Sequence, residues 1–134
     1  VSPSYILPLH GLQRLEKIMD EYVGGIGAHY TTNEPMLTRG LELLGMLKED
    51  LDHIGAEDLH QLMRAWELQH RVCASESVAR HTMFREETRW PGYYYRADHP
   101  KLDDTDWHCF TLSRYNPESG EWAMEKAPVH HIID

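Results

Sequence analysis

The sequence predicts a mostly α-helical fold: an antiparallel three-helix bundle followed by an aromatic-rich extended segment and a β-hairpin. Three observations favour this fold. Leucines recur every three or four residues from Leu37 to Leu51, which is the spacing of a bundle helix. The segment 58–90 contains neither Gly nor Pro, so nothing in it interrupts a long helix. Asn-Pro-Glu-Ser-Gly at 116–120 is a strong turn signal between two β-favouring segments.

The composition is that of one globular domain with an acidic surface. The chain has 134 residues, of which 41% are hydrophobic and 26% charged, and a chain of this length builds one core. Asp and Glu outnumber Lys and Arg by 22 to 13, which gives a net charge of −9. We therefore expect neither nucleic acid nor an anionic membrane surface as a partner. No apolar run approaches the roughly 18 residues of a membrane span, so we expect no membrane insertion.

The start of the chain and its two cysteines bear on its origin. The chain begins at Val1 rather than at Met, so we expect a processed product or a piece of a longer polypeptide. No basic segment followed by an apolar stretch marks a signal peptide. Cys73 and Cys109 are far apart and form no CxxC motif, which argues against a disulfide framework. These features favour a cytoplasmic location.

The first predicted helix covers residues 11–23 and follows an extended linker, residues 1–10, that contains two prolines. We expect residues 11–134 to form one domain. Apolar side chains recur at helical spacing in the first helix, at Leu12, Leu15, Ile18, Met19 and Tyr22. Gly24 and Gly25 follow directly, and because glycine accepts a positive φ they end the helix.

The second predicted helix covers residues 34–54. Asn33 is a suitable N-cap, and Pro35 lies in the first turn, where its missing N–H removes no hydrogen bond. The apolar stripe of this helix consists of Leu37, Leu41, Leu44, Leu47, Leu51 and Ile54. Gly40 and Gly45 each lower the helix propensity by about 1 kcal/mol, so we interpret them as points where another helix approaches closely.

The third predicted helix covers residues 58–86 and is long for a globular protein. One side of it carries Leu59, Leu62, Trp66, Cys73, Ser77 and Phe84. We predict that this side faces the core, with Cys73 buried in it. The loops between the three helices are short, which favours antiparallel neighbours.

The chain changes character after Trp90-Pro91-Gly92. Three consecutive tyrosines follow at 93–95, and their side chains alternate between faces if the segment is extended. We predict a β-hairpin over residues 107–126, followed by a tail at 129–134 that pairs with it or trails away. Before the hairpin, we expect Asp103 and Asp104 to cap backbone N–H groups of a turn and Trp107 to anchor the hairpin to the helices.

Few residue patterns indicate catalysis or metal binding. Ten histidines are scattered, without an HExxH motif and without an i, i+4 pair on a predicted helix, so we favour surface roles over a zinc site. Cys109 adjoins His108 in a predicted strand, where neighbours point to opposite faces, which disfavours a catalytic pair. Paired acids occur at 86–87 and 103–104, and hydrogen-bonding roles are favoured over acid–base catalysis. We predict no catalytic, cofactor-binding or metal-binding residue.

The densest group of chemically distinctive residues is the segment 85–96. Arginines alternate with aromatic residues in it, at Arg85, Arg89, Trp90, Tyr93, Tyr94, Tyr95 and Arg96. These residue types stack on one another, pair with carboxylates and concentrate binding energy at protein interfaces. Two interpretations stay open, an internal corner of the domain and an interface with another domain or subunit. We expect at least one of the aromatic rings to be exposed.

The segment 96–107 carries the pattern R-x-D-x-P-x-x-D-D-x-x-W. It resembles the C-terminal domain of fumarate reductase and succinate dehydrogenase flavoprotein subunits. The matching residues are Arg96, Asp98, Pro100, Asp103, Asp104 and Trp107. The segments 80–82, 85–96, 14–25 and 39–44 resemble one branch of that family, the alpha subunits of dissimilatory adenylylsulfate reductases. Relative to the fumarate reductase branch, the spacing between Arg89 and Arg96 contains a short insertion.

This resemblance implies a role within a longer flavoprotein. The family's alpha subunit carries FAD and reduces adenosine 5'-phosphosulfate to sulfite and AMP, with electrons from a beta subunit that holds two 4Fe–4S clusters. Its dinucleotide and substrate motifs lie in FAD and capping domains, and none of them occurs in this sequence. The implied role of this chain is therefore to pack on the FAD domain and help dock the iron–sulfur beta subunit, and we expect the isolated chain to be inactive.

Three other interpretations stay open. The first is the C-terminal domain of another fumarate reductase or succinate dehydrogenase-type flavoprotein. The second is a free-standing His-rich binding module, which stoichiometric zinc would favour. The third is a small complete enzyme that uses His81, Glu87 or Asp104 in a pocket, and flavin bands in the absorbance spectrum of the purified chain would contradict a purely structural domain.

Overall fold

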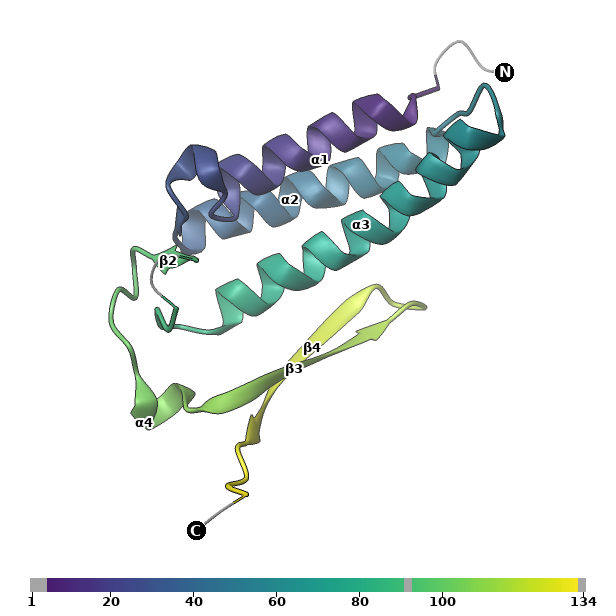
Figure 1. Cartoon of the computed structure of the whole chain (residues 1–134). Coiled ribbons are helices and arrows are strands. Elements are labelled where there is room, and N and C mark those ends of the chain that lie inside the picture. The colour runs from purple at the N-terminus through teal and green to yellow at the C-terminus, as the bar shows by residue number, and fades with distance from the viewer. Residues whose placement is uncertain (1–4, 91–92, 133–134) are drawn as a thin grey trace.

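The computed structural model describes residues 5–90 and 93–132. Three helices lie side by side, α1 (Pro8–Tyr22), α2 (Glu34–Asp50) and α3 (Leu59–Phe84), and successive helices run in opposite directions (Figure 1). The antiparallel strands β3 (Cys109–Asn116) and β4 (Glu121–Pro128) form a hairpin that lies along α3. The predicted class, a helical bundle followed by a hairpin, is confirmed. None of the helices in the described residues combines the length and the apolar character needed to cross a bilayer.

The core lies between the three helices, and the leucine stripe of α2 supplies its centre. Each helix contributes buried apolar side chains, which include Leu15, Ile18, Leu37, Leu44, Leu47, Leu68 and Val72. Each such side chain contributes about 1.5–3 kcal/mol when it is removed from water. The periodicity of leucines in the sequence therefore predicted both the second helix and the side on which it packs.

Local chemistry sets the ends of α1 and α2. Gly24 follows α1 with a φ of 83°, a conformation that few other residues accept. Asn33 caps α2, because its side-chain oxygen accepts a hydrogen bond from the backbone N–H of Met36 at 2.9 Å. A Cβ atom at Gly40 would lie 3.0 Å from the Cβ of Tyr22, so the predicted close approach is confirmed there. The same interpretation of Gly45 is wrong, since nothing lies within 4 Å of a Cβ at that position.

Several predicted boundaries differ from the structure. The expected linker 1–10 ends early, because α1 begins at Pro8, whose fixed φ suits the first turn of a helix. A separate 3₁₀ turn, η2 (Leu51–His53), follows α2, and the hairpin is shifted to 109–128. The residues 1–4, 91–92 and 133–134, which belong to the expected linker, turn and tail, lie outside the described residues.

The predicted core side of α3 is wrong. Its buried apolar residues are Ala65, Leu68, Val72 and Ala79. By contrast, Leu59 and Trp66 are 80% and 67% exposed, and Cys73 is also exposed. The core side contains two alanines, which let α3 pack closely against its neighbours, whereas the larger apolar side chains occupy another side. Side-chain size misled the prediction, since the bulkiest apolar stripe of this helix is not the one that faces the bundle.

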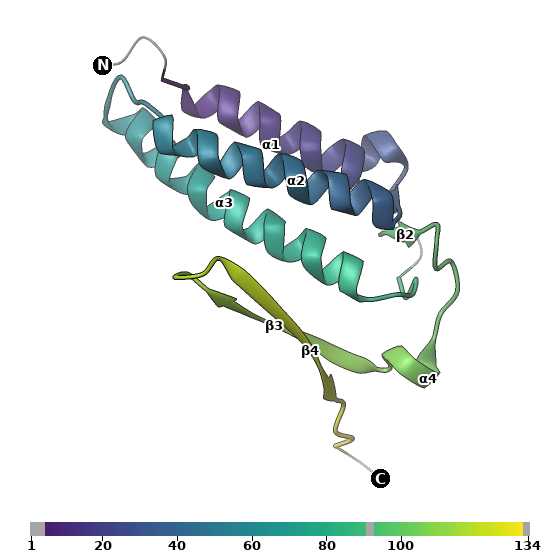
Figure 2. The ribbon, with the colours of Figure 1, turned by 180° about the vertical axis from the view of Figure 1, so that it is seen from behind.

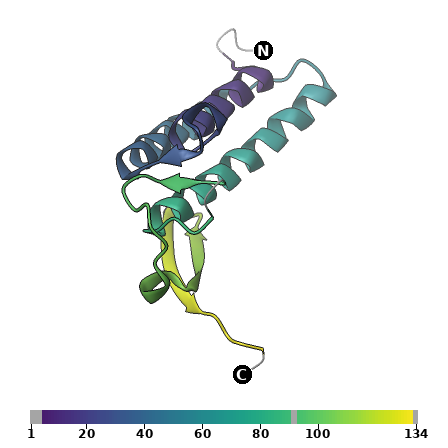
Figure 3. The ribbon, with the colours of Figure 1, turned by 60° about the vertical axis from the view of Figure 1, so that its left-hand side comes forward.

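Four short elements complete the fold. A 3₁₀ turn, η1 (Ile26–Ala28), precedes β1 (Thr31–Thr32), and β1 pairs in parallel with β2 (Tyr95–Arg96). The short helix α4 (Asp104–Trp107) then leads into β3. Figure 3 shows the β1–β2 pair beside the end of the bundle at which α2 begins and α3 ends. This pair brings the segment after α3 back to the bundle, where it can contact both helices.

Candidate functional site

Glu87 is fully buried and holds two arginines together just after α3. Its Oε1 accepts hydrogen bonds from Arg85 Nη1 and Arg89 Nε, both at 2.6 Å. Its Oε2 accepts from Arg89 Nη2 at 3.1 Å and from the backbone N–H of Asp103 at 2.9 Å. Burial by itself raises the pKa of Glu87, but the hydrogen bonds from Arg89, Asp103 and Arg85 outweigh it and lower that pKa. Glu87 is therefore ionised near neutral pH and is poorly suited to acid–base catalysis.

Arg96 is also fully buried, and it closes the C-terminal end of α3. Its Nη1 donates to the carbonyl oxygens of Thr82, Met83 and Arg85 at 2.7, 3.0 and 3.2 Å. The last carbonyls of a helix have no partner within the helix, so this guanidinium satisfies groups that burial would otherwise leave unpaired. The Nε and Nη2 of Arg96 form a bidentate pair with Asp98 at 2.8 and 2.7 Å.

Asp98 extends this contact to the beginning of α2. Its Oδ2 accepts a hydrogen bond from the backbone N–H of Glu34 at 3.0 Å. A carboxylate at a helix N-terminus and a guanidinium at a helix C-terminus both complement the helix dipole. The hydrogen bonds from Arg96 lower the pKa of Asp98 to about 2, against the opposing effect of burial. The Arg96–Asp98 pair thus joins the end of α3 to the start of α2.

The acids of α4 have different partners. The Oδ1 of Asp103 accepts hydrogen bonds from the backbone N–H groups of Thr105 and Asp106 at 3.1 and 3.0 Å, so its predicted capping role is confirmed. The capping role predicted for Asp104 is wrong: its side chain pairs instead with Arg89, at 2.9 Å between Oδ1 and Nη1. Only one cap is needed at the start of such a short helix, which leaves Asp104 free to pair with the nearby guanidinium.

Trp107 anchors the hairpin to α3, as predicted. It is 7% exposed and packs edge-on against Phe84, with 5.4 Å between the ring centroids. Lys126 of β4 places its Nζ 3.7 Å from the centroid of the indole ring. The backbone carbonyl oxygen of Trp107 also accepts hydrogen bonds from Arg85 and Arg89 at 2.7 and 3.2 Å. Trp107 therefore connects the hairpin, the helix and the paired arginines.

The aromatic residues of the segment lie mainly on the surface. Trp90, Tyr93 and Tyr95 are 64%, 81% and 40% exposed, so the expectation of an exposed ring is confirmed. Tyr94 is half-buried, and its hydroxyl donates to the carbonyl oxygen of Glu87 at 3.3 Å. The segment 85–96 thus has an interior of paired charges, which we call the arginine corner (Arg85, Glu87, Arg89, Arg96 and Asp98), and an aromatic exterior.

The sequence suggested Glu87 only as a possible residue of an enzyme pocket and did not place it at the centre of the arginine corner. The sequence contained a signal for it, the arginines two positions away on either side. The chain bends at Glu87 and brings its carboxylate to the guanidinium groups of both neighbours. The alternation of opposite charges in the pattern R-x-E-x-R could have indicated these ion pairs, although not the bend that forms them.

The structure does not assemble His81, Glu87 and Asp104 into a catalytic group. The ring nitrogens of His81 lie 3.2 and 2.9 Å from the hydroxyl oxygens of Thr111 and Ser113 on β3. Those contacts hold the hairpin against α3. Both carboxylate oxygens of Glu87 already accept hydrogen bonds from arginine side chains. A groove of about 360 Å³ runs between α3 and β3 beside Arg85 and Arg89, whose guanidinium groups already pair with Glu87.

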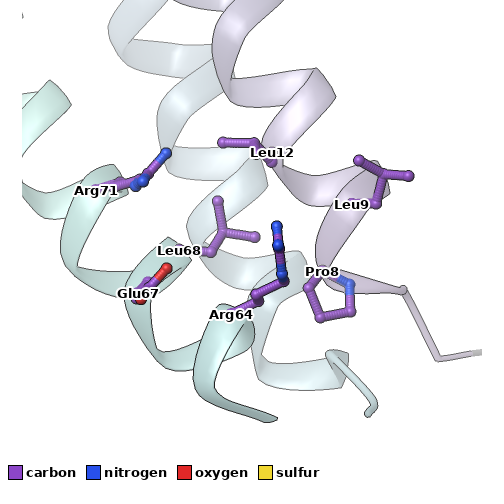
Figure 4. A pocket seen from close by; sticks show the side chains of 7 residues that line it. All are labelled: Pro8, Leu9, Leu12, Arg64, Glu67, Leu68 and Arg71. Atoms are coloured by element: carbon purple, nitrogen blue, oxygen red, sulfur yellow. The ribbon is translucent and has the colours of Figure 1, made fainter. Parts of the chain in front are cut away.

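A small cavity lies elsewhere, between the start of α1 and the first half of α3 (Figure 4). The lining residues are Pro8, Leu9, Leu12, Arg64, Glu67, Leu68 and Arg71. Its volume is about 70 Å³, far below the roughly 300–1,000 Å³ of ligand sites. FAD does not fit this cavity, and in the arginine corner the guanidinium groups that could face its phosphates are already paired with carboxylates. We therefore assign no FAD-binding residue at either of these two places.

Comparison with protein families identifies the class of domain. Residues 12–132 match the model of the fumarate reductase flavoprotein C-terminal domain. The chain belongs to this family. The match includes the whole arginine corner and the hairpin, so the contacts described above lie within the family's own domain.

Individual relatives indicate a branch of the family. The chain is 45% identical over 133 residues to the adenylylsulfate reductase subunit alpha of Megalodesulfovibrio gigas, covering 99% of this chain and 20% of the relative. It matches the structure of adenylylsulfate reductase from Archaeoglobus fulgidus with a TM-score of 0.96 and 59% identity, over 100% of this chain and 21% of that one. The chain thus spans about a fifth of the length of these relatives.

A more distant structure shares the fold. A variant of FrdA of the E. coli quinol fumarate reductase matches with a TM-score of 0.80 and 20% identity, over 95% of this chain and 22% of that one. At this identity the likeness concerns the fold alone. The bundle and hairpin are therefore common to chains whose sequences have diverged widely.

Proposed function

We propose that this chain, from the start of α1 onward, is the C-terminal structural and interaction domain of a dissimilatory adenylylsulfate reductase alpha subunit. The observation that carries the proposal is 45% identity across 99% of the chain to such a subunit, against 20% identity to a fumarate reductase flavoprotein. In the proposed reaction the bond between sulfur and the bridging oxygen of adenylylsulfate breaks. Sulfur takes up two electrons and leaves as sulfite, and AMP keeps the oxygen.

This chain contributes structure to that reaction rather than a reacting group. FAD is held by the parent chain, and the electrons come from an iron–sulfur beta subunit in the cytoplasm. The arginine corner joins the start of α2 to the end of α3, and the rings of Trp90, Tyr93 and Tyr95 are exposed in the segment that follows α3. We propose that this aromatic surface docks the beta subunit, since Trp, Tyr and Arg are the residues that dominate binding energy between subunits.

An activity measurement tests the proposed reaction. The full alpha subunit that contains this chain, purified with its beta subunit, should show flavin absorbance. It should also release sulfite and AMP from adenylylsulfate when a reduced artificial donor is supplied. The isolated 134-residue chain should show neither property. Fumarate reduction without turnover of adenylylsulfate would assign the chain to the other branch, and flavin bound to the isolated chain would contradict the structural role.

Substitutions in the aromatic surface test the docking role. Trp90→Ser and Tyr93→Ser in the full alpha subunit should weaken assembly with the beta subunit, measured by size-exclusion chromatography. The melting of the domain should hardly change, because both rings are exposed. Met46→Ser, at a 49% exposed position on α2, is the control and should assemble normally. If the domain unfolds while the surviving fraction assembles normally, the segment is an internal corner and the docking role is wrong.

A further inference from the structure

The first half of α3 carries an apolar surface that no other part of the described chain covers. Leu59, Leu62, Met63 and Trp66 are 80%, 56%, 62% and 67% exposed, and we call them the α3 stripe. Single exposed apolar residues are ordinary in folded proteins. Four of them within two turns of one helix form a continuous surface, and such surfaces mark contact sites.

The α3 stripe lies on a side of the helix that the bundle does not use. At about 100° per residue, its four side chains fall within an arc of about 100°. The centre of this arc is about 140° from the centre of the buried residues Ala65, Leu68 and Val72. The helix therefore has two apolar sides, and packing against α1 and α2 accounts for only one of them.

The hairpin covers the same side of α3 further along the helix. By the same arithmetic Arg80, His81 and Phe84 fall within the arc of the stripe. The guanidinium carbon of Arg80 lies 5.6 Å from the ring centroid of Trp122 on β4, and Phe84 packs against Trp107. In the views of Figures 1 and 2 the first turns of α3 extend past the tip of the hairpin. On this side of α3, the hairpin covers the C-terminal half of the helix, and the α3 stripe continues the same side into the half that the hairpin does not reach.

The chemistry of the stripe favours a permanent contact. The charged residues of this half of α3, Arg64, Glu67 and Arg71, lie outside the arc. Surfaces depleted of charge and rich in large apolar side chains resemble a domain core cut in half, which is typical of obligate contacts. The relatives are about five times as long as this chain, so most of such a polypeptide lies outside it.

From these observations we infer that the α3 stripe is the site at which the rest of the alpha-subunit polypeptide packs on this domain. The occupant is an apolar segment of the part of the alpha-subunit polypeptide outside this chain, and it extends the packing of the hairpin toward the start of α3. This inference rests on the proposed function only in taking the chain as part of a longer alpha subunit. In this proposal the α3 stripe contacts the rest of the alpha subunit, and the aromatic surface contacts the beta subunit.

Cysteine labelling in the full alpha subunit tests this assignment. Leu62→Cys places a thiol in the stripe, and Val78→Cys is the matched control, since Val78 is 53% exposed on α3 but lies outside the arc. Both variants carry Cys73→Ala, because trypsin would otherwise leave Cys73 and position 78 in one peptide. Labelling by a maleimide is followed for each peptide by mass spectrometry, with and without the beta subunit.

We expect position 62 to react at least about tenfold more slowly than position 78 in the alpha subunit alone, because a packed side chain reacts only through local opening. Equal labelling at both positions would overturn the inference. Protection of position 62 only after addition of the beta subunit, or only at high protein concentration, would assign the stripe to that subunit or to a second copy, and would also overturn it. Met63→Cys repeats the test if Leu62→Cys does not fold. The result is independent of the activity assay, which tests the reaction itself.

Discussion

The two halves of α3 expose the same side of the helix to different surroundings: Arg80, His81 and Phe84 meet the hairpin in the second half, whereas the apolar α3 stripe of the first half has no such cover among the described residues. In the second half, Phe84 packs on the buried Trp107, and Arg96 satisfies the last carbonyl groups of the helix. In the first half, Trp66 is 67% exposed on the same side. Burial of a residue on this helix is thus decided by segments far along the chain. The stability of the second half depends on residues 85–128, whereas the first half depends on the bundle alone.

Removing the Arg96 side chain should cause the largest loss of stability, because this side chain holds the C-terminal end of α3 in place. Arg96→Ala leaves three carbonyl groups and the carboxylate of Asp98 without their partner. We expect a loss of about 5 kcal/mol, the upper end of the range for breaking a buried ion pair. Urea denaturation of the 134-residue chain measures it. Arg114→Ala, whose side chain is 80% exposed, should change stability by less than about 0.5 kcal/mol, and equal losses in the two variants would contradict the structural role of Arg96.

Trp107→Ala removes the apolar anchor of the same half. The expected loss is about 3–5 kcal/mol, the usual range when a buried aromatic side chain is truncated. Thermal unfolding followed by circular dichroism measures it, with Trp90→Ala as the control because that ring is 64% exposed. A melting temperature lowered by only about a degree or two would mean that Trp107 contributes little to folding and serves a partner instead.

Asp98→Asn should change how the free energy of unfolding depends on pH, because Asp98 joins the end of α3 to the start of α2. The pKa of Asp98 is about 2 in the folded chain, against an ordinary value of 3.8. Its stabilisation is therefore complete above about pH 4 and is lost as the pH falls toward 2, by about 2 kcal/mol in total. In urea denaturation at a series of pH values, Asp98→Asn should not show this loss of stability between about pH 4 and pH 2. The control Asp52→Asn, at an exposed position, should show the same loss as the wild type. Parallel pH curves for wild type and Asp98→Asn would show that the ion pair does not join α2 to α3.

Trp66→Ala should have the smallest effect in the isolated chain. The residue is 67% exposed, and its ring contacts the ring of His70, one turn along the same helix, edge-on at 5.9 Å between centroids. We therefore expect a change of less than about 0.5 kcal/mol in the free energy of unfolding. Chemical denaturation compares it directly with Trp107→Ala, the same substitution on a covered ring. A loss of several kcal/mol would show that the first half of α3 is packed in the isolated chain after all, and the contrast between the two halves would fail.

The elements that were predictable are those whose causes lie within a few residues. The leucine spacing of α2, the cap at Asn33, the positive φ at Gly24 and the turn before β4 all follow from local conformational preferences. The resemblance of residues 96–107 to a flavoprotein family was also readable, since it depends on residue identity alone. The arginine corner was partly predictable: its arginines stood out in the sequence, but the place of Glu87 between Arg85 and Arg89 was missed.

The sequence by itself determined where the helices and the hairpin form, because caps, glycines and periodicity act over one or two turns. Only the tertiary structure decided which side of α3 is covered, that Thr31 and Thr32 pair with Tyr95 and Arg96, and that Asp98 meets the N-terminus of α2 across 64 positions of sequence. The physical reason is that burial and ion pairing depend on which surfaces meet in space. In α3, the hairpin covers one side of the helix near its C-terminal end and leaves the same side exposed at Leu59, Leu62, Met63 and Trp66.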